Sequence, residues 1–418
     1  MKDLVVEILT IGDEVLSGDI LDTNTQYLAE ACWLKGLSVE YHSAVRDEEM
    51  RITEALRLAA SRADVVFVTG GLGPTADDFT IEMAAKVFGV DLVEDSGALQ
   101  NLTLLMQKRG RTVTPNNRKQ ALVFQGGTVF INKVGTAPGS HYCYEGTDFY
   151  FMPGVPREMK PLFEEAMLPH FLSNHPSPMH YESIVLKTFG ATESELDRAL
   201  SDLLSSRVGI GNVRIGYRFS FPEVFIKLSA WDGAPSVAKS ALEDVVKRVE
   251  ERIGHFIYAR GAKSTLEGEL VKIFTERAKT IALAESCTGG LVASRLTNVP
   301  GSSQIFLGGV VSYDNAIKES LLGVSPEILR QHGAVSEACA LAMVRGINKL
   351  TNADYSAAIT GIAGPGGGSV EKPVGTVFIA TLCDGVEQCQ KFHFPFSRTM
   401  FKEICAAVVF KRFLGAVK

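Results

Sequence analysis

Short apolar runs alternate with amphipathic stretches along the first 170 residues of the chain. Three of these runs have the length and flanking residues of buried strands, and they cover residues 4–11, 39–45 and 64–69. Apolar positions recur at helical spacing over residues 25–35, 48–62 and 81–88. Strands that alternate with helices predict a doubly wound, mostly parallel sheet.

The same alternation returns from about residue 257 to the end of the chain. Runs typical of buried strands cover residues 280–284, 306–311, 353–360 and 374–382. Helical spacing covers residues 266–279, 291–296, 316–322, 336–350 and 398–414. This pattern predicts a second α/β domain of the same class.

The middle of the chain has a different order of elements. The stretch His175-Pro176-Ser177-Pro178 is typical of a linker. After it, the pattern predicts a β-α-β-β-α order over residues 181–189, 192–204, 213–217, 224–230 and 237–253. We therefore expect two mostly parallel-sheet α/β domains joined by a small α+β module, with domain bounds at residues 1–170, 171–256 and 257–418.

Composition narrows the class of protein. The net charge of −6 argues against a general nucleic-acid binder but leaves a small phosphate-bearing substrate open. The seven cysteines are scattered and form no C-x-x-C pair, which indicates free thiols in a reducing compartment. No run of about 18 apolar residues and no signal-peptide core are present. We expect a cytoplasmic protein that does not bind membranes.

The stretch Ala284-Glu285-Ser286-Cys287-Thr288-Gly289-Gly290 joins a predicted strand to a predicted helix. An α/β sheet usually places its chemistry at such a carboxyl strand end. We expect unpaired N–H groups of the first helical turn, near Cys287 to Gly290, to point towards Ser286, where they would stabilise an oxyanion. The alternative is that Ser286 or Thr288 only caps the helix.

Two further strand ends carry polar side chains that belong at the same edge of a parallel sheet. One presents Tyr313 with Lys318 after it, and the other presents Thr360 before the glycine-rich loop 361–368. A serine nucleophile needs a base, and because no histidine lies in these loops, Lys318 with a lowered pKa is the candidate. The alternatives are a solvated helix lysine and a half-buried tyrosine that only packs.

The loop from Gly70 to Asp78 is the informative part of the first domain. Its glycines let backbone N–H groups approach phosphate oxygens, and we assign phosphate binding to Gly70, Gly71, Gly73 and Thr75. Carboxylates beside a phosphate call for a divalent cation, for which the candidate ligands are Asp13, Glu14, Asp77 and Asp78. The alternative is that the two aspartates of the loop cap the helix that begins near Phe79.

Four motifs in the first domain resemble the N-terminal domain of the competence/damage-inducible protein A family. They are TIGDEVLSGDILDTN, TGGLGPTADDFT, GTAPG and PGVPREM. That domain is similar to molybdopterin-binding and adenylyltransferase domains, and the resemblance implies metal-aided hydrolysis of ADP-ribose. In the same family the middle module is similar to a KH-type domain. The chain has Gly209-Ile210-Gly211 without a basic flank, so we favour a structural spacer over weak RNA binding.

The motifs AESCTGG, SYDNAIK, HGAVS, TGIAGPGGG and EKPVGTV resemble the C-terminal domain of that family, which is similar to nicotinamide mononucleotide amidohydrolases. The resemblance implies deamidation of nicotinamide mononucleotide without a metal, by a homodimer. It makes Ser286 the nucleophile, Lys318 the base and Tyr313 its helper. It assigns substrate binding to Thr288, Gly289, Gly290, Thr360, Gly361, Arg398 and Lys402. The rival interpretation is a nucleotide-binding or competence-associated protein in which one or both sites are inactive.

Overall fold

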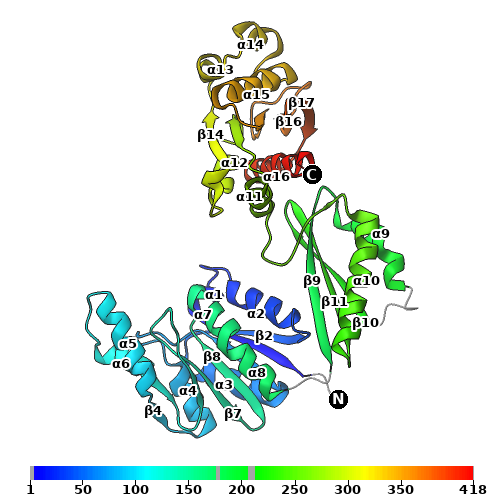
Figure 1. Ribbon diagram of the computed structural model, residues 1–418. Coiled ribbons are helices and arrows are strands. Elements are labelled where there is room, and N and C mark those ends of the chain that lie inside the picture. Colours follow the sequence, from blue (N-terminus) through cyan, green and yellow to red (C-terminus); the bar gives the residue numbers. More distant parts are fainter. Residues whose placement is uncertain (1–3, 176–178, 206–211, 418) are drawn as a thin grey trace. The chain divides into compact units, whose positions relative to one another are not determined.

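A computed structural model describes residues 4–175, 179–205 and 212–417 (Figure 1). The chain forms two compact units, residues 1–182 with 231–239 and residues 183–230 with 240–418. Most of the predicted linker, Pro176 to Pro178, and the glycines at 209 and 211 lie outside the described residues.

The first domain is built on a six-stranded sheet in the order β2-β1-β3-β8-β7-β6. Its strands are β1 (Val6–Ile11), β2 (Val39–Val45), β3 (Val65–Thr69), β6 (Thr128–Phe130), β7 (Gly139–Tyr144) and β8 (Thr147–Met152). The pairs β1–β2, β1–β3 and β3–β8 are parallel, whereas β7 and β6 continue the sheet in antiparallel pairs. A separate hairpin pairs β4 (Leu92–Glu94) with β5 (Leu122–Phe124).

Helices cover both faces of this sheet because alternate residues of a buried strand point to opposite sides. Val66 and Val68 pack with α3 (Glu49–Arg62) and α4 (Thr80–Phe88), whereas Val65 and Phe67 pack on the other face. That face is covered by α2 (Thr23–Trp33), α7 (Pro156–Leu162) and α8 (Leu168–Asn174), with a π-helical turn at Phe163–Met167. The remaining helices are α1 (Asp13–Leu16), α5 (Ser96–Lys108), α6 (Pro115–Arg118) and the 3-10 turn η1 (Lys119–Ala121).

The middle module has a four-stranded sheet in the order β10-β11-β9-β12. Its elements are β9 (His180–Phe189), α9 (Glu193–Ser205), β10 (Asn212–Ser220), β11 (Glu223–Asp232), α10 (Pro235–Ile253) and β12 (Ile257–Arg260). Both helices share one apolar core with the strands. Because β12 pairs with β9, the sheet continues beyond residue 256, where the sequence pattern ended this module.

The last domain has a five-stranded sheet in the order β14-β13-β15-β16-β17. Its strands are β13 (Ile281–Glu285), β14 (Phe306–Val311), β15 (Tyr355–Gly361), β16 (Thr376–Cys383) and β17 (Val386–His393). The three strands β14, β13 and β15 are parallel, and the other two pairs are antiparallel. The predicted α/β class, with two parallel-rich sheets and an α+β module between them, is confirmed.

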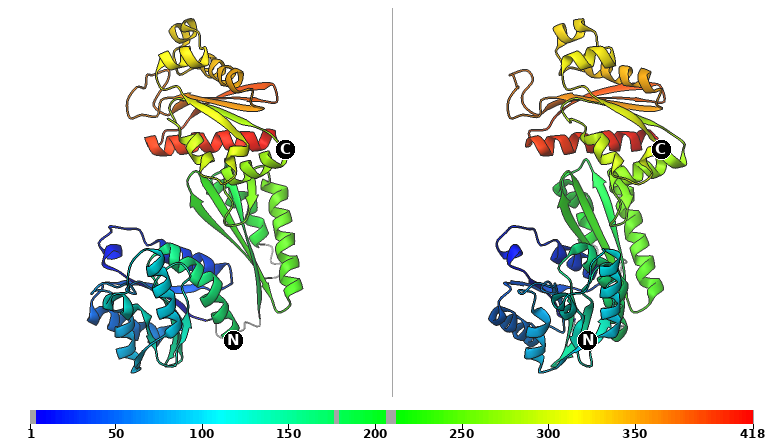
Figure 2. Two further views of the ribbon diagram at one scale, coloured as in Figure 1. Left: turned by 60° about the vertical axis from the view of Figure 1, so that its left-hand side comes forward. Right: turned by 90° about the vertical axis from the view of Figure 1, so that its left-hand side faces the viewer.

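Helices also cover both faces of the five-stranded sheet, as Figure 2 shows for α16 on one face and α13 to α15 on the other. Ile281 and Leu283 pack with α11 (Leu266–Glu276), α12 (Leu291–Thr297) and α16 (Arg398–Ala416). Ala282 and Ala284 pack with α15 (Glu337–Thr351). The other helices are α13 (Asn315–Leu322), α14 (Pro326–His332) and the 3-10 turn η3 (Ser302–Gln304). Within the described residues, no helix combines the length and apolar character needed to cross a membrane.

Glu7 is the one residue of β1 whose buried side chain carries a charge, and it is 1% exposed. Arg62 of α3 donates to both of its oxygens, at 2.9 and 2.6 Å, and the Ser43 hydroxyl donates at 2.7 Å. We expect Arg62→Ala to lower the free energy of unfolding by about 3 kcal/mol, because it leaves a buried carboxylate without its cation. Urea unfolding of the full chain measures this change.

The matched control is Arg51→Ala on the same helix, because Arg51 pairs with Glu54 where both side chains are more than half exposed. An exposed pair of this kind contributes below about 1 kcal/mol. Equal losses for the two arginine variants would contradict the role assigned to Glu7 and Arg62.

Candidate functional site

The parallel strands β14, β13 and β15 bring three loops together at their carboxyl ends, as predicted. A cavity of about 240 Å³ lies there. Six predicted site residues line it: Ser286, Tyr313, Lys318, Thr360, Gly361 and Arg398. The other lining residues are Cys287, Asn315, Ala334, Val335 and Ala363, and of these the sequence pattern singled out only Cys287, for its backbone amide.

Ser286 follows the last residue of β13 and is 9% exposed. Its N–H donates to the carbonyl of Ile359 at 3.0 Å, and its own carbonyl accepts the N–H of Gly289 at 3.1 Å. The N-cap of α12 is Gly290, in a left-handed conformation and without a side-chain cap. The alternative in which Ser286 or Thr288 caps the helix is therefore wrong.

The expectation that the N–H groups at the start of α12 are unpaired is also wrong. The carboxylate of Glu285 accepts those of Gly290, Val292 and Ala293, at 2.9, 3.1 and 2.9 Å. The N–H of Leu291 donates to the carbonyl of Thr288. The helix start is saturated because the strand residue that precedes Ser286 ends in a carboxylate.

Lys318 lies on α13 and is 1% exposed, so the alternative of a solvated helix lysine is wrong. Its Nζ donates to the carbonyls of Ser312 at 2.6 Å and Tyr313 at 3.2 Å. Burial lowers the pKa of the Lys318 amine, against smaller opposite effects of Cys339, Asp314 and Cys287. A lowered pKa increases the fraction of Lys318 that is present as the neutral amine, which is the form that accepts a proton.

Tyr313 is 61% exposed, so the alternative of half-buried packing is wrong. Its hydroxyl accepts a hydrogen bond of 2.8 Å from Nη2 of Arg398, whose Nη1 donates to the carbonyl of Gly364 at 2.9 Å. Lys402, one turn further along α16, places its Nζ 3.9 Å from where a Cβ on Gly289 would lie. Two cations of one helix thus reach all three loops at this edge.

The two predicted threonines differ in their surroundings. Thr360 is buried, lines the cavity, and donates its hydroxyl to the carbonyl of Ala334 at 2.7 Å. Thr288 is fully buried, and its hydroxyl has no hydrogen-bond partner within the described residues. The Thr360 hydroxyl therefore fixes the loop that contains Ala334. The cavity lining does not include four predicted residues, which are Thr288, Gly289, Gly290 and Lys402.

The first domain has a comparable edge at the carboxyl ends of β2, β1 and β3. Asp13 and Glu14 follow β1, the loop from Gly70 to Asp78 follows β3, and Asp47, which the sequence analysis missed, follows β2. Asp47 accepts the N–H of Asp13 at 3.0 Å. Burial raises the pKa of the Asp47 carboxyl, and the charges of Asp13, Glu14 and Asp77 raise it further. The negative charges of three other carboxylates therefore act on Asp47 at this edge.

The loop after β3 is held by contacts that the sequence pattern did not predict. Lys119 of η1 donates from Nζ to the carbonyl of Asp78 at 2.7 Å and to that of Thr75. The carboxylate of Asp78 accepts the N–H of Thr75 at 2.9 Å. Helix α4 has Phe79 as its N-cap and no side-chain cap, so the alternative in which the aspartates cap it is wrong.

Gly70 shows why this loop is rich in glycine. Its φ is +112°, and a Cβ there would lie 1.9 Å from the carbonyl oxygen of Ile11. The loop can approach β1 this closely only without a side chain. Gly71 and Gly73 lie in the same loop and line a small cavity with Asp78, Lys119 and Gln120.

The carboxylate oxygens at this edge are of the kind that hard divalent cations bind. Within the described residues, however, no three histidine, cysteine, aspartate or glutamate side chains lie close enough together to hold a metal ion. A metal ion at Asp13, Glu14, Asp77 and Asp78 stays a prediction, and Asp47 joins its candidate ligands.

Each of the three segments of the chain matches the model of a known protein domain. Residues 7–173 match the model of a probable molybdopterin binding domain, residues 183–259 match the damage-inducible protein CinA KH domain, and residues 263–417 match the CinA C-terminal domain. The structure is also similar to the crystal structure of competence/damage inducible protein CihA from Agrobacterium tumefaciens. That match has 37% identity and a TM-score of 0.36, and it covers 37% of this chain and 98% of that one.

Relatives match the whole chain. A CinA-like protein of Syntrophotalea carbinolica is 38% identical over 99% of both chains. A CinA-like protein of Geotalea uraniireducens is 38% identical over 93% of this chain and 91% of its own length. The chain belongs to the CinA family.

Proposed function

We propose that the C-terminal site hydrolyses the carboxamide of nicotinamide mononucleotide, giving nicotinate mononucleotide and ammonia. The observation that carries this proposal is Lys318, a buried lysine with a lowered pKa that lines one cavity with Ser286. A binding protein has no need of a buried amine beside a hydroxyl, whereas an amidase needs both.

In the proposed reaction, the Oγ of Ser286 attacks the carboxamide carbon, and its proton passes to the Nζ of Lys318. Lys318 then gives that proton to the nitrogen as the C–N bond breaks, and ammonia leaves. Water hydrolyses the resulting ester and restores the serine hydroxyl. Arg398 and Lys402 supply positive charge for the phosphate, and Arg398 also orients the Tyr313 hydroxyl.

Ser286→Ala is expected to abolish ammonia release from nicotinamide mononucleotide, because the hydroxyl that forms the ester is gone. The loss should exceed about 10³-fold in kcat, and nucleotide binding should persist, since the methyl group fits where the hydroxyl was. Coupled detection of ammonia with the purified full chain measures the first, and calorimetric titration with the nucleotide measures the second.

The control is Ser320→Ala, because Ser320 is an exposed residue of α13 whose hydroxyl bonds only within its own helix. Ammonia release by Ser286→Ala at the rate of the Ser320→Ala variant would refute the proposal. A wild type that binds the nucleotide and leaves it unchanged would indicate a binding role.

The pH dependence of kcat/KM should follow the amine of Lys318. Because burial lowers its pKa, the rate is expected to rise with pH through that lowered value and to level off below the ordinary lysine pKa of about 10.4. Lys318→Arg should lose about 10²- to 10⁴-fold, because a guanidinium does not give up its proton in this range. A profile that is flat from neutral to alkaline pH would argue against Lys318 as the base.

For the N-terminal site we propose hydrolysis of the pyrophosphate of ADP-ribose to AMP and ribose 5-phosphate. Support comes from a glycine loop held by Lys119 and from the carboxylates gathered beside it. The loop N–H groups would bind phosphate oxygens, and Asp78 keeps the loop in shape through Thr75. A divalent cation, once bound, would neutralise charge between the carboxylates and the pyrophosphate.

Asp78→Asn is expected to lower turnover of ADP-ribose by about 10- to 100-fold, since the amide disturbs both the loop and the candidate metal ligands. A chelator should remove the activity of the wild type. Asp91→Asn is the control, because Asp91 is exposed and follows α4 at a distance in sequence from the loop. Chromatographic quantification of AMP measures all three, and full turnover by Asp78→Asn with chelator present would refute the assignment.

A further inference from the structure

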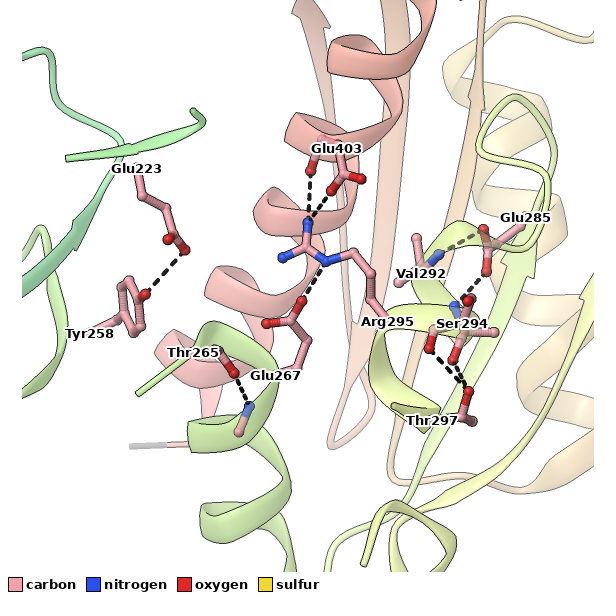
Figure 3. A network of polar contacts seen from close by, with 12 residues as sticks. Glu223, Tyr258, Thr265, Glu267, Glu285, Val292, Ser294, Arg295, Thr297 and Glu403 are labelled. Atoms are coloured by element: carbon pink, nitrogen blue, oxygen red, sulfur yellow. Dashed lines mark hydrogen bonds and ion pairs between the residues drawn. The ribbon is translucent and has the colours of Figure 1, made fainter. Parts of the chain in front are cut away.

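Glu285 is a buried carboxylate next to the proposed nucleophile, and the reaction described above does not use it. It is the last residue of β13 and is 1% exposed. Figure 3 shows its side chain turned towards the start of α12, where it accepts the N–H of Val292. Its other two hydrogen bonds come from the N–H groups of Gly290 and Ala293.

Burying a carboxylate is costly unless its oxygens are hydrogen-bonded. Glu285 has three N–H donors at 2.9 to 3.1 Å, and bonds of this kind to a charged acceptor are stronger than neutral ones. Among the described residues, no lysine, arginine or histidine forms an ion pair with it. The backbone of the loop therefore takes the place of a cation, and the loop and carboxylate stabilise each other.

These contacts determine which N–H groups beside Ser286 remain without an oxygen acceptor. Those of Gly290, Val292 and Ala293 bind Glu285, and those of Gly289 and Leu291 bind carbonyls within the loop. The N–H groups of Cys287 and Thr288 have no oxygen acceptor within the described residues, and they contact only the thiol of Cys287, which is a weak acceptor. The two donors left for an oxyanion are thus the two that directly follow the nucleophile.

The main chain of Glu285 makes a second connection, to the base. Its carbonyl accepts the N–H of Ser312 at 2.8 Å, and the carbonyl of Ser312 accepts Nζ of Lys318 at 2.6 Å. One residue thus links the loop that carries the nucleophile to the segment that holds the amine.

We propose that Glu285 is a positioning residue of the amidase. It folds the Ser286–Gly290 loop so that the N–H groups of Cys287 and Thr288 receive the oxyanion formed when Ser286 attacks the carboxamide. This inference rests on the proposed amidase function. It goes beyond that function in two ways. The oxyanion donors are assigned to two loop amides. The placement of these amides is assigned to a carboxylate that never touches the substrate.

The other end of α12 offers a matched control, which Figure 3 also shows. Arg295 of this helix donates to Glu267 of α11 and, at 2.7 Å, to Glu403 of α16. Glu403 therefore anchors the same helix through a side chain, without contacting the loop.

The test compares Glu285→Gln with Glu403→Gln. In Glu285→Gln an amide NH₂ replaces one oxygen and faces N–H groups that need an acceptor, so the loop should reopen. We expect kcat for nicotinamide mononucleotide to fall by about 100-fold, as when one oxyanion donor is lost. KM should stay within about threefold, because only the transition state carries the new charge. Glu403→Gln should keep kcat within about twofold, since a glutamine still accepts from Arg295.

A kcat for Glu285→Gln equal to that of Glu403→Gln would overturn the inference, and so would equal large losses in both variants, which would show general loosening of α12. If Glu285→Gln does not fold, Glu285→Asp replaces it, because its charge is retained but it is too short to reach all three donors. An unchanged kcat in that variant is equally decisive.

Residue-level hydrogen exchange separates this inference from the amidase proposal. In wild type, the N–H groups of Gly290, Val292 and Ala293 should be protected, and the protection should be lost in Glu285→Gln but not in Glu403→Gln. If the wild type releases no ammonia, the proposed function is refuted, and the hydrogen-exchange result alone then tests whether Glu285 holds the loop. Unchanged protection in Glu285→Gln overturns the inference whatever the activity.

Discussion

The backbone hydrogen bonds between parallel strands are the constraint on which both candidate sites depend. In the ladder β14-β13-β15, the strand ends align at one edge, so that Ser286, Lys318 and Thr360 meet although they lie far apart in sequence. The ladder β2-β1-β3 does the same for the loops after three strands of the first domain. In each three-stranded ladder the middle strand, β1 or β13, comes first in the sequence, and helices on both faces of the sheet fix its neighbours. A slip of one residue in the register of β15 would turn Thr360 to the opposite face of the sheet.

The buried charged side chains of this chain differ in how well their charges are paired, and the difference separates residues that stabilise the fold from the proposed catalytic base. Glu7 has Arg62 as its counter-ion, and Glu285 has three backbone N–H donors, so both stay fully paired at low exposure. Lys318 is buried as deeply, but the hydrogen bonds that its Nζ donates within the described residues go to two neutral carbonyls. A hydrogen bond to a carbonyl offsets less of the cost of burying a cation than a carboxylate does, and the pKa of the amine accordingly falls. Lys318 is thus the buried residue whose charged form is least stabilised, and it is the residue proposed to act as a base in its neutral form.

The sequence predicted most of the parallel strands and the helices that follow them. The strands β1, β2, β3, β13, β14 and β15 appeared within a few residues of their observed bounds, because buried strands are continuous apolar runs. No element was predicted between residues 88 and 170, so the parallel strand β8 and the helix α5 were missed. Strand β17 was missed because it is an edge strand with polar residues at most positions, and β12 because four residues give no periodic signal. The site residues at strand ends were found by the rule that places chemistry there. That rule also covers Asp47, which follows β2 as Asp13 follows β1. Lys119 and Gln120 lie on a short 3-10 turn far along the chain, and only the tertiary fold brings them to the loop at 70–78.

The two edges share one architecture and carry opposite charge, which bears on how each would hold a phosphate. The C-terminal edge has its own cations, because Arg398 and Lys402 of α16 reach the loops around the cavity. A phosphate can bind such an edge directly. The N-terminal edge gathers Asp13, Glu14, Asp47 and Asp77, whose mutual repulsion contributes to the raised pKa of Asp47. A pyrophosphate that approaches those carboxylates adds negative charge to negative charge, so we expect it to arrive with a cation that the proposed amidase site would not need. Divalent-cation dependence should therefore separate the two proposed activities.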